Sequence, residues 1–223
     1  MDDRQRLARE CLWASIGVLA VLGLLKHLGA LVPFIAEYAF AAAAAAQLYA
    51  PLMIADRVGI SRKALGLEPD HWKRDVGIAL LLGVVTIVPY AIGHHYWQTE
   101  VFHRKLMPRL PDGLLLSVAT QIIAVALPEE LFYRGYLQAR MEKLWPAKRT
   151  LFGAPFGKAL LTASFVFALA HFVGEYRPDR LGPFFPALLF GILRSRTGSI
   201  VAPVTYHAFC NILSEMLFAC YYR

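Results

Sequence analysis

Two adjacent glutamates, Glu129 and Glu130, follow a run of apolar residues, and Arg134 comes one helical turn after Glu130. On a helix, Glu130 and Arg134 are spaced i and i+4 and can pair, whereas Glu129 lies about 100° around the helix axis. One carboxylate can thus be neutralised by arginine while its neighbour stays free to act as a base. An intramembrane carboxylate is costly, so it is a candidate functional group that faces a polar cavity. The alternative is an interfacial ion pair that anchors a helix end.

Two further pairs of residues stand in apolar segments later in the chain. Phe167 and His171 are four residues apart in SFVFALAHF, and His207 and Asn211 are four residues apart in VTYHAFCN. Each pair therefore shares one helix face. Hydrogen-bonding side chains deep in an apolar helix are costly unless they serve each other or a ligand. A packing histidine and a polar clamp between helices are the non-catalytic interpretations of these residues.

Taken together, these glutamate, histidine and asparagine side chains are the inventory of a peptidase without a serine or cysteine nucleophile. A carboxylate and an imidazole can hold and deprotonate a water molecule. A second imidazole and an amide can donate hydrogen bonds to the oxyanion that forms when this water attacks a peptide carbonyl.

The elements that must position these groups are membrane helices. With 57% hydrophobic residues, 17% charged residues and a mean hydropathy of +0.47, the chain is too apolar for an ordinary soluble domain. We predict an all-α, polytopic transmembrane helix bundle that forms one integral membrane domain over residues 1–223. Its seven predicted spans are residues 10–26, 32–55, 75–93, 113–128, 157–173, 183–193 and 199–221. An eighth span is expected if residues 94–108 re-enter the membrane.

The distribution of charge predicts the orientation and the partners. Sixteen of the 23 Lys and Arg residues fall in loops that are cytoplasmic if the N-terminus is inside, which predicts a multi-pass protein of the inner (plasma) membrane with a cytoplasmic N-terminus. The net charge of +7 is spread among helix ends, which favours contact with the lipid bilayer and its anionic headgroups over nucleic acid. The three cysteines stand at no metal-ligand spacing.

Three short motifs resemble a known family of membrane proteins. E-E-x-x-x-R at 129–134, F-x-x-x-H at 167–171 and H-x-x-x-N at 207–211 occur in the order found in the CAAX protease and bacteriocin-processing family of intramembrane endopeptidases. The resemblance covers residues 113–213, the expected catalytic core. Residues 1–112 match only as N-terminal spans and loops. The resemblance implies a helix bundle with a conical polar cavity.

The resemblance also implies roles for individual residues. Glu129, with His171, would activate the attacking water, while His207 and Asn211 would stabilise the oxyanion. The supporting residues that it implies are Glu130, Arg134 and Phe167. Glu and His can ligate zinc, but the chain has no H-E-x-x-H helix and an amide suits oxyanion donation better than metal binding. We therefore expect a glutamic-type protease without a cofactor, with zinc as the alternative.

The expected substrate is a membrane protein or peptide with a C-terminal processing tail. Eukaryotic family members remove the last three residues of prenylated Cys-a-a-X proteins, and prokaryotic members include bacteriocin-immunity proteins and myxosortase-like enzymes that process sorting tails. The short chain, rich in Ala and Arg, resembles the prokaryotic branch. Two other functions stay open. One is a non-proteolytic immunity or binding protein of the same fold. The other is a proton-coupled carrier, although the inverted repeats that a carrier predicts are not visible in the sequence.

Overall fold

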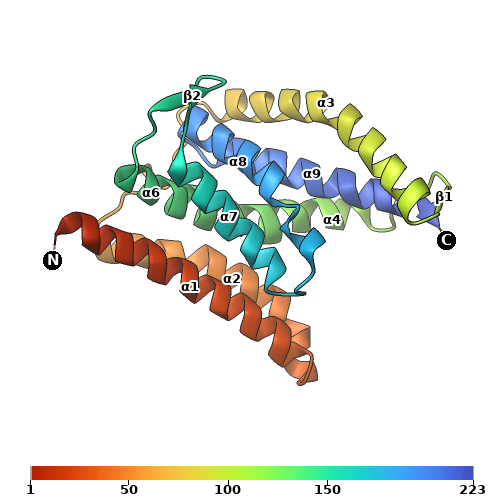
Figure 1. Ribbon diagram of the computed structural model, residues 1–223, viewed down its shortest axis with the longest axis horizontal. Helices are drawn as coiled ribbons and strands as arrows, with labels where there is room; N and C mark the ends of the chain where they lie inside the picture. Colours follow the sequence, from red (N-terminus) through yellow and green to blue (C-terminus); the bar gives the residue numbers. More distant parts are fainter. Residues whose placement is uncertain (1, 223) are drawn as a thin grey trace.

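The computed structural model describes residues 2–222 and is 75% helical, which confirms the predicted all-α fold (Figure 1). The N-terminal helices are α1 (Asp3–Gly29), α2 (Pro33–Val58) and α3 (Trp72–Tyr96), which the π-helical η1 (Trp97–Val101) continues. The central helical stretch consists of α4 (Leu114–Thr120), η2 (Gln121–Ala126), α5 (Leu127–Glu130), η3 (Leu131–Gln138) and α6 (Ala139–Leu144). The C-terminal helices are α7 (Lys158–Phe172), η4 (Pro178–Leu181), α8 (Phe184–Thr197) and α9 (Val201–Ala219). Short antiparallel ribbons pair β1 (Lys105–Leu106) with β4 (Tyr221–Tyr222) and β2 (Arg149–Leu151) with β3 (Ala154–Phe156).

Each of the seven predicted spans coincides with a helix, but their lengths differ from the prediction. Among residues 2–222, four helical stretches are long and apolar enough to cross a membrane: Asp3–Gly29, Pro33–Val58, Trp72–Val101 and Leu114–Leu144. The apolar helix α7 is shorter. Residues 94–108 add no separate helix, because they continue α3 and η1 to Val101 and then form β1.

The fourth span extends well beyond its predicted end at residue 128. The helical stretch runs on through both glutamates to Leu144, so Pro128 lies inside it. Proline has no N–H to donate to the carbonyl four residues earlier, and the wider π-helical turns of η2 lie directly before it. The π-helical segments η2 and η3 therefore flank α5, the short helix that carries both glutamates. Such insertions are frequent at functional sites.

The helices α1 and α2 form a hairpin along one side of the molecule, and α3 lies on the opposite side (Figure 1). The side chain of Asp2 accepts a hydrogen bond from the Arg4 amide at the start of α1, and Pro33 begins α2. Gly59 ends α2 in a left-handed conformation, which glycine adopts without a steric penalty. The turn of this hairpin lies at residues 30–32, between the first two helices.

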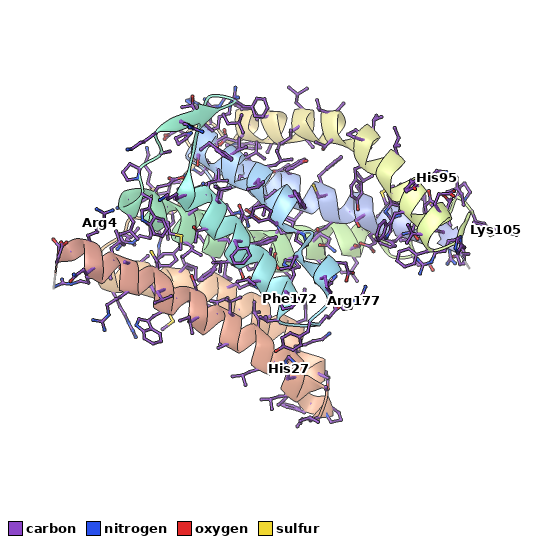
Figure 2. All side chains as sticks on the ribbon, in the orientation of Figure 1. Arg4, His27, His95, Lys105, Phe172 and Arg177 are labelled. Carbon is purple, nitrogen blue, oxygen red and sulfur yellow. The ribbon has the colours of Figure 1, made fainter. Side chains whose placement is uncertain are left out.

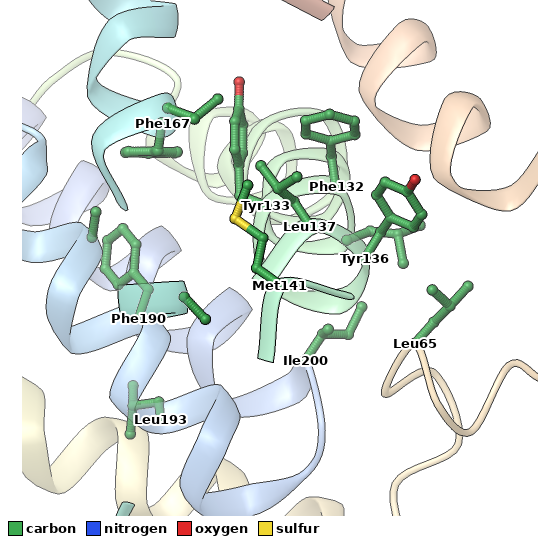
Figure 3. Packing of buried hydrophobic residues seen from close by; sticks show 14 of the residues in the cluster. Leu65, Phe132, Tyr133, Tyr136, Leu137, Met141, Phe167, Phe190, Leu193 and Ile200 are labelled. Atoms are coloured by element: carbon green, nitrogen blue, oxygen red, sulfur yellow. The ribbon is translucent and has the colours of Figure 1, made fainter. Parts of the chain in front are cut away.

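The core lies around η3, whose eight residues are all buried. Figure 3 shows Phe132, Tyr133 and Leu137 among side chains contributed by α7, α8 and the loop before α3. Gly135 lets the chain pass close by, because a Cβ atom at this position would lie 2.7 Å from the Leu65 carbonyl oxygen. The tight packing around η3 fixes the helix that follows the two glutamates.

Candidate active site

The predicted Glu130–Arg134 pair is present and fully buried. Glu130 Oε1 lies 3.0 Å from Arg134 Nη1 and 2.8 Å from His207 Nδ1, so one carboxylate oxygen joins α5 to η3 and to α9. The Arg134 guanidinium also donates to the Ala187 carbonyl and lies 4.4 Å from the centre of the Phe167 ring. The contact between Glu130 and His207 was not predicted, because residues 77 positions apart show no spacing signal.

Glu129 has a different environment from its neighbour. Its side chain is 18% exposed, and its Oε2 atom lies 3.8 Å from His207 Nε2. Among the described residues, Glu129 has no Arg or Lys partner, and its Oε2 is buried without a hydrogen bond. The structure therefore has one carboxylate paired with arginine, as predicted, and a neighbouring carboxylate whose ion-pair partner is a histidine.

His171 is held by its own helix. Its Nδ1 lies 3.0 Å from the Phe167 carbonyl oxygen one turn earlier. A carbonyl only accepts hydrogen bonds, so Nδ1 carries the proton and Nε2 of the neutral ring carries the lone pair. The Phe167 ring lies 4.7 Å from the His171 ring and 5.8 Å from the His207 ring, measured between centroids. Phe167 thus packs against both histidines, in keeping with its predicted supporting role.

His207 is oriented from two sides. Its ring is stacked on Phe190 at 4.7 Å, and its Nδ1 donates to the Glu130 carboxylate. Nε2 is left on the side of Glu129. For Nε2 to donate a hydrogen bond as well, the ring must carry both protons.

Asn211 has a partner that the sequence analysis missed. Its Nδ2 donates to Gln121 Oε1 over 2.9 Å. Gln121 is the first residue of η2 and precedes Glu129 by eight residues. Eight residues of a regular α-helix end about 80° around the axis from their start, so the spacing alone did not identify Gln121. The available signal was a polar side chain in an apolar segment.

Two cavities with mostly apolar linings lie around these residues and share His171, so the single conical polar cavity that the resemblance implies stays a prediction. The first, which we call the hairpin cavity, has a volume of about 370 Å³, lies between the α1–α2 hairpin and the α5 and α7 region, and is lined by Glu129 and His171. The second, which we call the aromatic cavity, has a volume of about 480 Å³, lies among α3, α8 and α9, and is lined by His171, His207 and Asn211. His171 therefore lines both cavities, together with Glu129 in the first and with His207 and Asn211 in the second.

Metal-binding side chains are not clustered in the described part of the chain. Within residues 2–222, no group of three or more His, Cys, Asp and Glu side chains is arranged to hold a metal ion. Glu130 Oε1 is already shared by Arg134 and His207, and Asn211 is bonded to Gln121.

Comparison with known families confirms the resemblance. Residues 111–213 match the family model described as type II CAAX prenyl endopeptidase Rce1-like. All seven predicted catalytic and supporting residues lie in this part of the chain. A search of curated proteins and a search of solved structures gave no match.

Proposed function

Residues 111–213 belong to the Rce1-like type II CAAX prenyl endopeptidase family, and from this premise we propose that the protein is a glutamic-type intramembrane endopeptidase. Its substrate is a membrane-associated or lipidated protein that is cut near the C-terminus. The observation that carries the proposal is the placement of the arginine-free Glu129 and His171 in one cavity. The aromatic cavity, which shares His171 with the hairpin cavity, is lined by His207 and Asn211, the proposed hydrogen-bond donors.

In this mechanism, Glu129 and His171 activate a water molecule. The Glu129 carboxylate and the lone pair on His171 Nε2 both accept hydrogen bonds, so a water between them is polarised from two sides. Loss of its proton to Glu129 lets the oxygen attack the scissile carbonyl carbon, and the same proton then passes to the leaving amine. Positioned bases of this kind contribute about 10²- to 10⁴-fold to the rate.

The negative charge that develops on the carbonyl oxygen is stabilised from α9. His207 Nε2 and Asn211 Nδ2 are the donors, because Nδ1 of the histidine is already bonded to Glu130. The Arg134 guanidinium balances the charge of the Glu130 carboxylate. Glu130 can therefore hold His207 without being an unpaired buried charge. An oxyanion donor of this type typically contributes about 10²- to 10³-fold to kcat.

The aromatic cavity suits the apolar part of a lipidated tail. It is lined by several aromatic side chains, including Phe167, Phe190 and Phe209, and its polar groups are few. We propose a prenylated or otherwise apolar C-terminal tail as the substrate, with a sorting tail of the myxosortase type as the competing choice. No cofactor is required by this mechanism.

We place the protein in the plasma (inner) membrane with a cytoplasmic N-terminus. This proposal rests on the excess of Lys and Arg in alternate loops. The apolar helices and the family match establish a membrane protein, and cysteine accessibility from either side of sealed vesicles tests the orientation.

Cleavage of synthetic tail peptides in liposomes tests the activity. We expect cleavage by the wild type that survives a strong chelator, and a loss of about 10³-fold in Glu129→Gln and His171→Ala. The exposed Glu68→Gln variant serves as the matched control and should retain full activity. Chelator-sensitive cleavage would favour a metallopeptidase. No cleavage by well-folded wild type across prenylated and sorting tails would favour a binding or immunity protein.

A further inference from the structure

Two cationic side chains line the hairpin cavity together with Glu129 and His171. Lys26 comes from the last turn of α1, and Arg180 comes from η4 in the loop after α7. Figure 2 shows His27, next to Lys26, on the same side of the molecule as Arg177 of that loop. The ring of His27 lies 5.3 Å from the ring of Tyr176, so the end of α1 contacts the loop.

Lys26 and Arg180 both keep N–H groups that have no acceptor among the described residues. Arg180 Nη2 lies 3.1 Å from Glu175 Oε1, but Arg180 Nε is buried and has no acceptor among the described residues. Lys26 is exposed and forms no salt bridge with any residue in 2–222. A buried N–H without a partner is costly, so the cavity offers a place for an anionic oxygen.

The charges of the loop pair with one another and with Arg180, and none of them pairs with Lys26. Arg177 donates to Asp179 over 2.6 Å, and this hydrogen bond lowers the pKa of the Asp179 carboxyl. Arg177 also lies 4.0 Å from Glu175. Together, the cavity and this loop carry three cations, Lys26, Arg177 and Arg180, and three carboxylates, Glu129, Glu175 and Asp179, and Lys26 is the cation without a salt bridge among residues 2–222.

We propose that Lys26 and Arg180 bind the free C-terminal carboxylate of the substrate tail. This inference rests on the proposed endopeptidase function, because it assumes that the scissile bond lies close to the end of the chain. A cavity of about 370 Å³ is about 9 Å across if roughly spherical, and an extended tripeptide reaches about 10 Å. A carboxylate held at the rim thus leaves room for about three residues before the bond reaches Glu129.

The site also sets the direction of the bound chain. The residues after the scissile bond occupy the hairpin cavity with their carboxylate at Lys26 and Arg180. The apolar part before the bond occupies the aromatic cavity, and His171 lies between the two. The position of cleavage is then measured from the C-terminal carboxylate.

Binding of two forms of one peptide tests this site without requiring turnover. The probe is a fluorescent peptide ending in S-farnesyl-Cys-Val-Ile-Ala, prepared as the free acid and as the C-terminal amide. Its affinity is measured by anisotropy for the Glu129→Gln protein in phosphatidylcholine nanodiscs. We expect the acid to bind about tenfold more tightly than the amide, as expected for charge-assisted hydrogen bonds in a partly buried cavity. The added substitutions Lys26→Met and Arg180→Gln should each bring this ratio towards one, and the control Arg177→Gln should leave it unchanged.

Equal affinity for acid and amide, or a ratio that both cavity variants leave intact, would overturn the proposal. Either result leaves the endopeptidase function standing, because cleavage by the wild type is measured separately. Loss of the ratio in phosphatidylglycerol nanodiscs, with retention in phosphatidylcholine, would instead assign the two cations to a lipid phosphate and also overturn it.

Discussion

At the scale of single residues, Glu129 and Glu130 differ because each faces a different part of the bundle. Glu130 is fully buried and shares one oxygen between Arg134 and His207. Glu129 faces the hairpin cavity and has no basic Arg or Lys partner in the described chain. The first carboxylate therefore stabilises and orients other side chains, while the second is available to accept a proton.

The Glu130→Gln substitution should destabilise the protein far more than Glu129→Gln. Loss of the Glu130 charge leaves the fully buried guanidinium of Arg134 without a counter-charge, which typically costs about 3–5 kcal/mol. The measurement is the free energy of unfolding in an SDS titration. Equal stability of the two variants would mean that Arg134 finds another partner.

Gln121 should act as a positioning residue for Asn211. Gln121→Met keeps the size but removes the acceptor of the 2.9 Å hydrogen bond, so the amide of Asn211 loses its fixed orientation. We expect kcat to fall roughly tenfold to hundredfold with little change in KM, since misplacement of a catalytic group has effects of this size.

The conservative variant Gln121→Glu keeps an acceptor oxygen at the same position and should retain most of kcat. A parallel loss of kcat and stability in both variants would indicate a packing role instead.

At the scale of elements, the site depends on the irregular helical stretch from Leu114 to Leu144. The π-helical η2 and η3 lie on either side of α5, and Pro128 lies within α5. The wider turns change the rotation of the helix, so that Gln121, Glu129 and Glu130 reach Asn211 and His207 on α9. In a regular α-helix, the side chains of these residues would point in different directions relative to one another.

Gly135→Ala should disrupt the packing of η3. The added Cβ would lie 2.7 Å from the backbone oxygen of Leu65, which has no flexible side-chain end to move aside. We expect a loss of about 1–3 kcal/mol in the free energy of unfolding and a decrease in activity. Gly77→Ala on α3 is the control, because its Cβ would meet nothing within 4 Å. A destabilisation no larger than that of the control would contradict the close packing.

At the scale of the whole molecule, the α1–α2 hairpin closes one wall of the hairpin cavity. Its attachment to the central stretch includes Glu10, which accepts two hydrogen bonds from Arg140 at 2.8 and 2.7 Å and one from Tyr136 at 2.9 Å. Both charged side chains are mostly buried. The N-terminal hairpin thus contributes to the site because it packs against Tyr136 and Arg140, which lie in the part of the chain that matches the family model.

Substitution of Glu10 or Arg140 by Gln should loosen the hairpin. Hydrogen bonds between charged groups contribute about 1.5–3 kcal/mol, so each variant should lose roughly 2 kcal/mol in SDS unfolding. The exchanged pair, Glu10→Arg with Arg140→Glu, should recover part of that loss. Asp56→Asn breaks an exposed pair with Arg62 and should change stability by less than about 1 kcal/mol. If both variants behave like Asp56→Asn, the hairpin is held by apolar packing alone.

The sequence by itself determined the helices and the membrane class, and it supplied the candidate residues of the site. Apolar runs and i, i+4 spacings are local properties, so the seven helical segments, the Glu130–Arg134 pair and the contact of Phe167 with His171 could all be predicted. The family motifs then singled out Glu129, His207 and Asn211.

Only the tertiary structure decided how these residues meet. The contacts of His207 with Glu130 and of Asn211 with Gln121 join positions 77 and 90 residues apart. The continuation of the fourth span through Pro128 and the two cavities around His171 likewise depend on which helix faces lie opposite each other. Helix periodicity fixes the face on which a side chain lies, but the packing of distant helices selects its partner.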